Sequence, residues 1–143
     1  MMKYKVILVM VDGSEDAEKA FQRSVEIAKA NEAQLVIGNV VDTSSFYLIE
    51  PYDSRIWEHA EQESYSLLKK YAEKAKKSGL ENIEIVTKNG SPKKTIVKDI
   101  APEYSTDLII VGATGMGRFE SFLLGSVSES VTRYAACDVY VVR

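Results

Sequence analysis

The chain alternates between short apolar runs and longer segments in which apolar residues recur every three or four positions. The apolar runs are rich in Val and Ile and are nearly continuous, which is typical of strands buried on both faces of a parallel sheet. They predict five strands, at residues 5–11, 35–41, 83–86, 108–111 and 138–142.

Helical spacing marks the segments between these runs. Apolar and small residues recur at this spacing over 17–28, 56–75 and 127–134, and each stripe predicts an amphipathic helix. Acidic residues enrich the first turn of the earliest helix, where they favour the positive end of the helix dipole. Gly79 is expected to close the second helix in a left-handed conformation.

Ser91 and Pro92 open a further helix, as an N-cap and as a proline at the first helical position. Pro102 is expected to kink that helix or to end it early. Strands that alternate with helices throughout indicate right-handed crossovers and a parallel sheet covered on both faces. The expected fold is therefore a doubly wound, Rossmann-like α/β domain over residues 1–143.

Charge and cysteine content narrow the class of protein. The 143 residues carry 18 basic and 21 acidic side chains, a net charge of -3, with no block of like charge. Nucleic acid and anionic membranes both reward a basic surface, so neither is expected as a partner. One cysteine, Cys137, excludes an internal disulfide, and no apolar stretch approaches the roughly 20 residues that span a bilayer. We expect a soluble cytoplasmic protein.

Candidate chemistry lies at the carboxyl ends of the predicted strands, where doubly wound sheets bind ligands. Asp12 follows the first strand and Asp42 the second. The fourth strand leads into a glycine-rich segment with Gly112, Gly115, Gly125 and Ser126. Glycines let backbone amides approach phosphate oxygens, and a helix N-terminus favours anions.

Ser126 is expected to be the N-cap of the last helix, because Ser126 and Glu129 have the spacing of a capping box. A capped helix directly after a glycine-rich loop and a buried strand favours phosphate binding.

With Val11-Asp12-Gly13-Ser14, with the run from Asp107 to Gly112, and above all with its glycine spacing, the chain resembles the ATP-binding branch of the universal stress protein family. The resemblance covers the whole chain and implies the strand order 3-2-1-4-5. It implies that Gly112 and Gly115 face the ribose and phosphates and that Gly125 and Ser126 hold the phosphates.

The same resemblance implies that Asp12 lies near the ribose or a phosphate-bound metal, and that the backbone of Val41 meets the adenine. ATP, ADP or AMP is then the cofactor, with Mg²⁺ or Mn²⁺ as the assisting cation. Many relatives have a basic residue immediately before the second glycine, where this chain has Thr114; Arg118 could compensate.

Other interpretations of single residues stay open. Asp12 could instead cap the first helix or hydrogen-bond the turn. His59 has no neighbouring ligand and is expected at the surface, and Cys137 is expected to be a buried, inert thiol. The aromatic residues Phe46, Tyr47 and Tyr52 fit either a loop over the core or a lid over the nucleotide.

Three functions compete. The favoured one is a regulatory, nucleotide-binding stress-response module that is not an enzyme, since the P-loop pattern and an evident general base are both absent. A nucleotide-free dimerisation module and a phosphoacceptor receiver domain are the alternatives. A receiver needs an Asp after the third strand, where Asn89 and Gly90 stand. A homodimer paired through the apolar last strand is expected in the first two cases.

Overall fold

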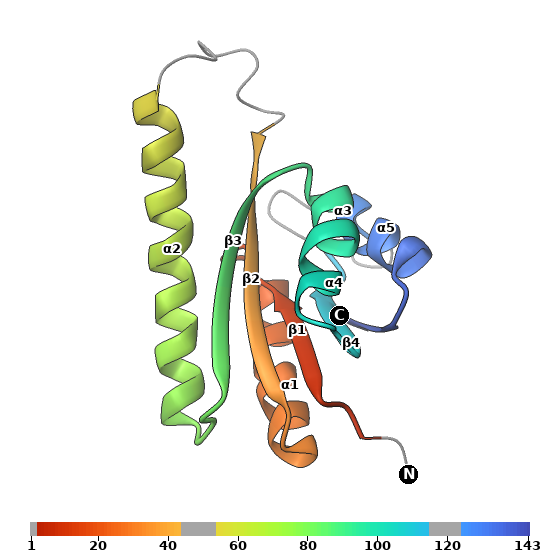
Figure 1. The fold of residues 1–143 in the computed structure, drawn as a ribbon. Helices are drawn as coiled ribbons and strands as arrows, with labels where there is room; N and C mark the ends of the chain where they lie inside the picture. The colour runs from red at the N-terminus through yellow and green to blue at the C-terminus, as the bar shows by residue number, and fades with distance from the viewer. Residues whose placement is uncertain (1–2, 44–53, 115–123) are drawn as a thin grey trace.

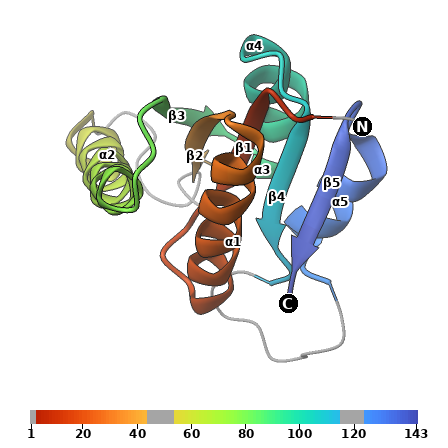
Figure 2. The same cartoon turned by 90° about the horizontal axis from the view of Figure 1, so that it is seen from below.

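The computed structural model describes residues 3–43, 54–114 and 124–143 (Figure 1). It contains one parallel sheet, built from the strands β1 (Val6–Met10), β2 (Gln34–Asp42), β3 (Ile83–Gly90), β4 (Leu108–Gly112) and β5 (Asp138–Val142). Their order is β3-β2-β1-β4-β5, so β1 is central, and Figure 2 shows β3 and β5 at the two edges. The predicted doubly wound class and strand order are confirmed.

Helices cover both faces of the sheet. The helices α1 (Glu15–Asn31) and α2 (Ser54–Lys77) pack on one face, and α5 (Ser126–Tyr134) packs on the other, together with the short segments that follow β3 (Figure 2). Successive strand residues point to opposite faces, so Ile7 belongs to the core under α1 and Leu8 to the core under α5. The nearly continuous apolar runs follow from this burial on both faces.

The ends of the first two helices follow local sequence signals. Ser14 is the N-cap of α1, and its hydroxyl accepts a hydrogen bond from the Ala17 amide at 3.1 Å. After α2, Gly79 has a φ of 104°, the left-handed conformation that was predicted for it.

The helix after β3 contains a π turn. Its parts are α3 (Pro92–Thr95), the π-helical segment η2 (Ile96–Ile100) and α4 (Ala101–Glu103). The Ala101 amide bonds the Ile96 carbonyl, five residues back, just before Pro102, which has no amide hydrogen to donate. The helix therefore widens ahead of the proline and ends one residue after it, as expected for an early end.

The two edge strands differ in character. β3 carries Glu84 and Lys88, and Lys88 forms an ion pair with Glu103 at 3.4 Å. β5 has only Asp138 at its start, and its remaining residues, Val139 to Val142, are apolar or aromatic. Charged side chains protect an edge from pairing with another chain, so β3 is the protected edge.

Candidate functional site

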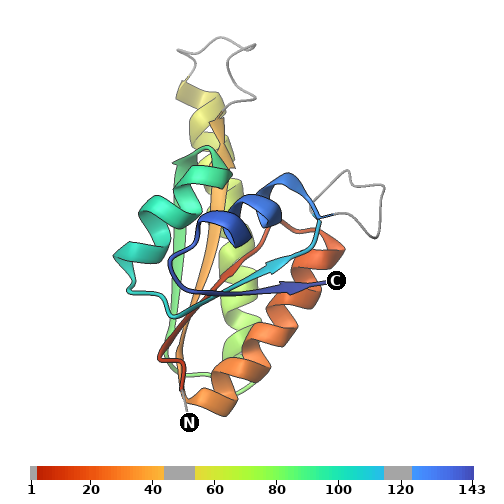
Figure 3. The same ribbon diagram turned by 90° about the vertical axis from the view of Figure 1, so that its right-hand side faces the viewer.

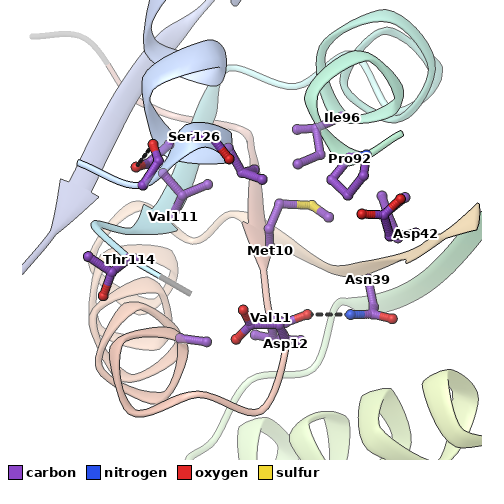
Figure 4. Close-up of a pocket in the computed structure, with 16 residues that line it drawn as sticks. Met10, Val11, Asp12, Asn39, Asp42, Pro92, Ile96, Val111, Thr114 and Ser126 are labelled. Carbon is purple, nitrogen blue, oxygen red and sulfur yellow. Dashed lines mark hydrogen bonds between the residues drawn. The ribbon is translucent and has the colours of Figure 1, made fainter. Parts of the chain in front are cut away.

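A pocket of about 460 Å³ opens at the carboxyl ends of β1 and β4 (Figure 4). The neighbours of β1 are β2 on one side and β4 on the other, so the pocket lies where the strand order reverses. Its volume is that of a small-ligand site. Four of the residues proposed from the sequence line it together: Asp12, Gly112, Gly125 and Ser126.

The other two proposed residues have different outcomes. Val41 is buried and is not among the residues that line the pocket, whereas its neighbours Val40 and Asp42 are. Gly115 falls within 115–123, outside the described residues, and so does Arg118. The aromatic residues at 46, 47 and 52 are also outside the described part of the chain.

The turn after β1 brings Asp12 to the pocket. The Asp12 carboxylate accepts a hydrogen bond from the Ser14 amide at 2.9 Å, and its side chain is otherwise exposed. Gly13 follows with a φ of 85°. Asp12 therefore fixes the turn, one of the two open interpretations, while Ser14 rather than Asp12 caps α1. The hydrogen bond described for Asp12 uses one of its two carboxylate oxygens.

Polar side chains on β2, α2 and β3, which the sequence patterns did not single out, support this turn through a series of hydrogen bonds. The Asn39 amide group donates to the Val11 carbonyl at 2.6 Å (Figure 4), and the Ser64 hydroxyl donates to the Asn39 oxygen at 2.7 Å. Ser64 also lies 2.6 Å from the Thr87 hydroxyl. The signal was present, since Asn39 interrupts an apolar strand and Ser64 occupies the apolar stripe of a helix.

The end of β4 lies unusually close to α1. A Cβ atom added to Gly112 would stand 2.9 Å from the backbone of Asp16, so only glycine fits between strand and helix. The Thr114 amide and hydroxyl both donate to the Asp16 carboxylate, the amide at 3.2 Å. Gly112 thus has a packing role as well as a place in the lining of the pocket.

The last helix begins one residue earlier than expected. Gly125 is the N-cap of α5 and Ser126 is its first residue, so the predicted capping box of Ser126 with Glu129 is wrong. Gly125 takes an extended conformation, with its amide bonded to the Ala113 carbonyl at 2.7 Å. The Ser126 side chain is therefore not used for capping, and it is exposed at the pocket.

The pocket has both apolar and polar lining. Met10, Pro92 and Ile96 lie near one another, with the Asp42 side chain beside Pro92 (Figure 4). Asp12, Thr114 and Ser126 lie at other places around the pocket (Figure 4). The residues described as lining the pocket include two carboxylates and no Lys, Arg or His, so an anionic ligand there needs backbone amides or a cation to balance its charge.

The two reactive side chains singled out from the sequence lie elsewhere. His59 is exposed on α2 and lies 2.9 Å from Glu63. Cys137 is half-buried, and burial raises the pKa of its thiol above 9.0. Among the described residues, no group of three or more His, Cys, Asp or Glu side chains could hold a metal ion.

Comparison with known proteins decides the family. The family model described as the universal stress protein family matches residues 3–143. The chain belongs to the universal stress protein family. A putative universal stress protein of Staphylococcus haemolyticus is 45% identical over 143 residues, which cover 100% of this chain and 87% of that protein.

Solved structures of the family share the fold of this universal stress protein. The universal stress protein UspA from Lactobacillus plantarum has a TM-score of 0.88 at 30% identity, with each chain covered completely. A universal stress protein solved in complex with cAMP has a TM-score of 0.77 at 28% identity and 99% coverage of both chains. In the described part of this universal stress protein, no helix is long and apolar enough to cross a membrane.

Proposed function

We propose that this universal stress protein is a regulatory module that binds ATP, or a closely related adenine nucleotide, in the pocket between β1 and β4. The observation that carries the proposal is the meeting of Asp12 with Gly112, Gly125 and Ser126 around one pocket at the reversal of strand order. A base would lie against Met10, Pro92 and Ile96, and phosphates would lie against the amides at the start of α5, since the Gly125 amide is bonded to the Ala113 carbonyl. The relative solved with cAMP supports a nucleotide as the class of ligand.

Little or no turnover is part of the proposal. The described lining offers two carboxylates, those of Asp12 and Asp42, as an acid or base but supplies no Lys, Arg or His to stabilise charge on a leaving phosphate. A bound divalent cation, held by Asp12, is proposed to balance the phosphates. The module then acts in the cytoplasm through what it binds.

A thermal melt tests this function directly. ATP with Mg²⁺ at about 100 times its dissociation constant adds about 2.7 kcal/mol to the free energy of unfolding. For a chain of this size we expect the Tm to rise by roughly 5 to 10 °C. No shift with ATP, ADP, AMP or cAMP, with or without Mg²⁺, would refute nucleotide binding and favour the nucleotide-free module.

The role of Asp12 is tested by Asp12→Asn. Asparagine keeps the acceptor for the Ser14 amide and removes the charge, so the fold should persist while the difference between Mg²⁺ and a chelator disappears. Glu15→Gln is the matched control, because it removes one charge from the adjacent exposed first turn of α1. If the cation dependence is the same in Asp12→Asn and in the parent, Asp12 does not hold the metal.

We also propose a homodimer that pairs through β5. This strand is hydrogen-bonded to β4 on one side only, and Val139, Tyr140 and Val141 are only half-buried. Antiparallel pairing of two copies would satisfy the open backbone groups. Val141→Lys should give a folded monomer by light scattering, while Ile85→Lys, a half-buried position on the opposite edge, should stay dimeric. A monomeric parent would remove the proposal.

A further inference from the structure

Two described residues on either side of 115–123, Ala113 and Gly125, are hydrogen-bonded to each other. Ala113 follows β4, and its amide donates to the Val142 carbonyl at 2.7 Å. Its own carbonyl accepts a hydrogen bond from the Gly125 amide, also at 2.7 Å. The two ends of the segment are thereby joined directly. We call Ala113, Thr114 and Gly125 the neck.

A buried hydroxyl holds the neck from the side of α5. Ser128 is 3% exposed, and its hydroxyl lies 2.8 Å from the Ala113 carbonyl and 3.1 Å from the Gly125 carbonyl. A hydroxyl has one hydrogen to donate, so the two carbonyls share it. Because one carbonyl belongs to each end of the segment, Ser128 couples the two ends.

A carboxylate holds the neck from the side of α1. Asp16 accepts hydrogen bonds from both the amide and the hydroxyl of Thr114, and its side chain is 22% exposed. The close approach at Gly112 brings Asp16 within reach. Figure 3 shows α1 and α5 on opposite sides of β4. Asp16 and Ser128 therefore contact the neck from opposite sides, and their helices pack in separate hydrophobic cores.

We propose that Ser128 and Asp16 are positioning residues for the nucleotide phosphates, a role that rests on the proposed function. Neither needs to touch the ligand. The amides of Thr114 and Gly125 are used inside the neck, so the ligand meets the residues whose position the neck sets. Ser128 and Asp16 hold the neck so that Gly112 and the start of α5, at Ser126 and Val127, line the pocket in one fixed arrangement. Ordering these groups before binding removes an entropy cost that the ligand would otherwise meet.

Ser128→Ala tests the α5 side, with Ser24→Ala as its matched control. Ser24 is also a fully buried serine whose hydroxyl bonds a carbonyl, that of Phe21 at 2.6 Å, but it lies outside the pocket lining. By calorimetry with ATP and Mg²⁺, Ser128→Ala should raise the Kd about tenfold, the factor for one ordinary hydrogen bond. Ser24→Ala should leave the Kd unchanged, and Ser128→Thr, which keeps the hydroxyl, should restore it.

Amide hydrogen exchange without nucleotide provides an independent readout. The Gly125 amide should exchange faster in Ser128→Ala than in the parent, because the hydroxyl no longer holds the carbonyls together. If the Gly125 amide exchanges at the same rate in Ser128→Ala and in the parent, Ser128 does not hold the neck. If the amide exchanges faster but the Kd is unchanged, Ser128 is not a positioning residue for the nucleotide. If the parent binds no nucleotide, the proposed function fails, and exchange still decides whether Ser128 holds the neck.

Asp16 provides a second arm. Asp16→Ala should raise the Kd about tenfold, whereas Asp16→Asn, which keeps an acceptor for Thr114, should stay within about twofold. Asp107→Ala is the control, since this carboxylate also accepts two chain bonds, from the Lys5 and Val6 amides, at the opposite end of the sheet. Equal losses in Asp16→Ala and Asp16→Asn would overturn the role of Asp16 as an acceptor.

Discussion

The turn after β1 and the neck after β4 both reach the pocket, but the fold holds them by different means. The turn is held through Asn39, whose hydrogen bonds continue to Ser64 on α2 and from there to Thr87 on β3. The neck is held by two separate contacts, from Ser128 and from Asp16. The turn is thus supported by a continuous series of polar side chains through the core, whereas the neck is supported by two independent local hydrogen-bond contacts.

Because the turn and the neck are held differently, substitutions at the two places should affect different properties: the stability of the domain and its affinity for nucleotide. Breaking the hydrogen-bonded chain at Asn39 takes a partner from two groups, the Val11 carbonyl and the Ser64 hydroxyl, so the whole domain should become less stable. Removing the contact of Ser128 or of Asp16 with the neck leaves the backbone hydrogen bond between Ala113 and Gly125 in place. We therefore expect changes at the turn to lower the free energy of unfolding, and changes at the neck to act mainly on nucleotide affinity.

The largest expected effect is that of Asn39→Ala. The change removes the side-chain donor to the Val11 carbonyl and the acceptor of the Ser64 hydroxyl, and should cost about 3 kcal/mol of unfolding free energy. Denaturant unfolding measures it. Asn31→Ala is the control, because Asn31 also makes two hydrogen bonds, to the Tyr4 amide and the Ile27 carbonyl, away from the pocket. Asn31→Ala should lower stability without changing affinity, whereas a fully stable Asn39→Ala protein would contradict the comparison.

Gly112→Ala should lower both the free energy of unfolding and the affinity for nucleotide. The added methyl group meets the Asp16 backbone at 2.9 Å, so α1 must move away from β4, at a cost of about 2 kcal/mol, and carry its carboxylate away from Thr114. Gly38→Ala is the control, because there the methyl group meets the flexible Met10 side chain at 3.0 Å. We expect Gly38→Ala to cost less in thermal melts. Equal costs would mean that α1 adapts freely.

The smallest expected effect is the dependence of the unfolding free energy on pH that arises from Tyr71. Burial, and then the charge of Glu18, raise the pKa of Tyr71 from 10.0 to about 12. The unfolded phenol loses its proton first, so stability is complete below pH 10 and falls as the pH rises toward 12. Denaturant midpoints against pH should show that Tyr71→Phe removes part of this fall. The exposed Tyr65→Phe should not, and an identical fall in both variants would exclude Tyr71 as its source.

Sequence patterns were sufficient for the fold because burial on both faces leaves a strong record. The five apolar runs gave the five strands, and the family resemblance gave their order. The same reasoning brought Asp12, Gly112, Gly125 and Ser126 to one edge, since parallel strands end on the same side. Asp12 and Gly112 lie at the ends of β1 and β4, and Gly125 and Ser126 begin the helix that follows β4, so their positions depend on topology more than on side-chain packing.

The supports behind the site could not be predicted in this way. Asn39 and Ser64 lie on different elements, and a pattern along the chain does not tell which polar residues will meet across a core. Asp16 is an acidic residue in a first helical turn, where the helix dipole is a sufficient explanation. The shift of the N-cap from Ser126 to Gly125 arises because the Ala113 carbonyl engages the Gly125 amide, a contact between residues far apart in sequence.

The unequal edges of the sheet limit how far such a protein can polymerise. Any pairing through β5 leaves two copies of β3 as the outer edges of the combined sheet. Each outer edge then carries Glu84 and Lys88, and Lys88 is already engaged by Glu103. Strand-by-strand growth into a fibre would require a further chain to displace these charges. In the proposed dimer, the charged outer edges of the combined ten-stranded sheet therefore oppose the addition of a further chain.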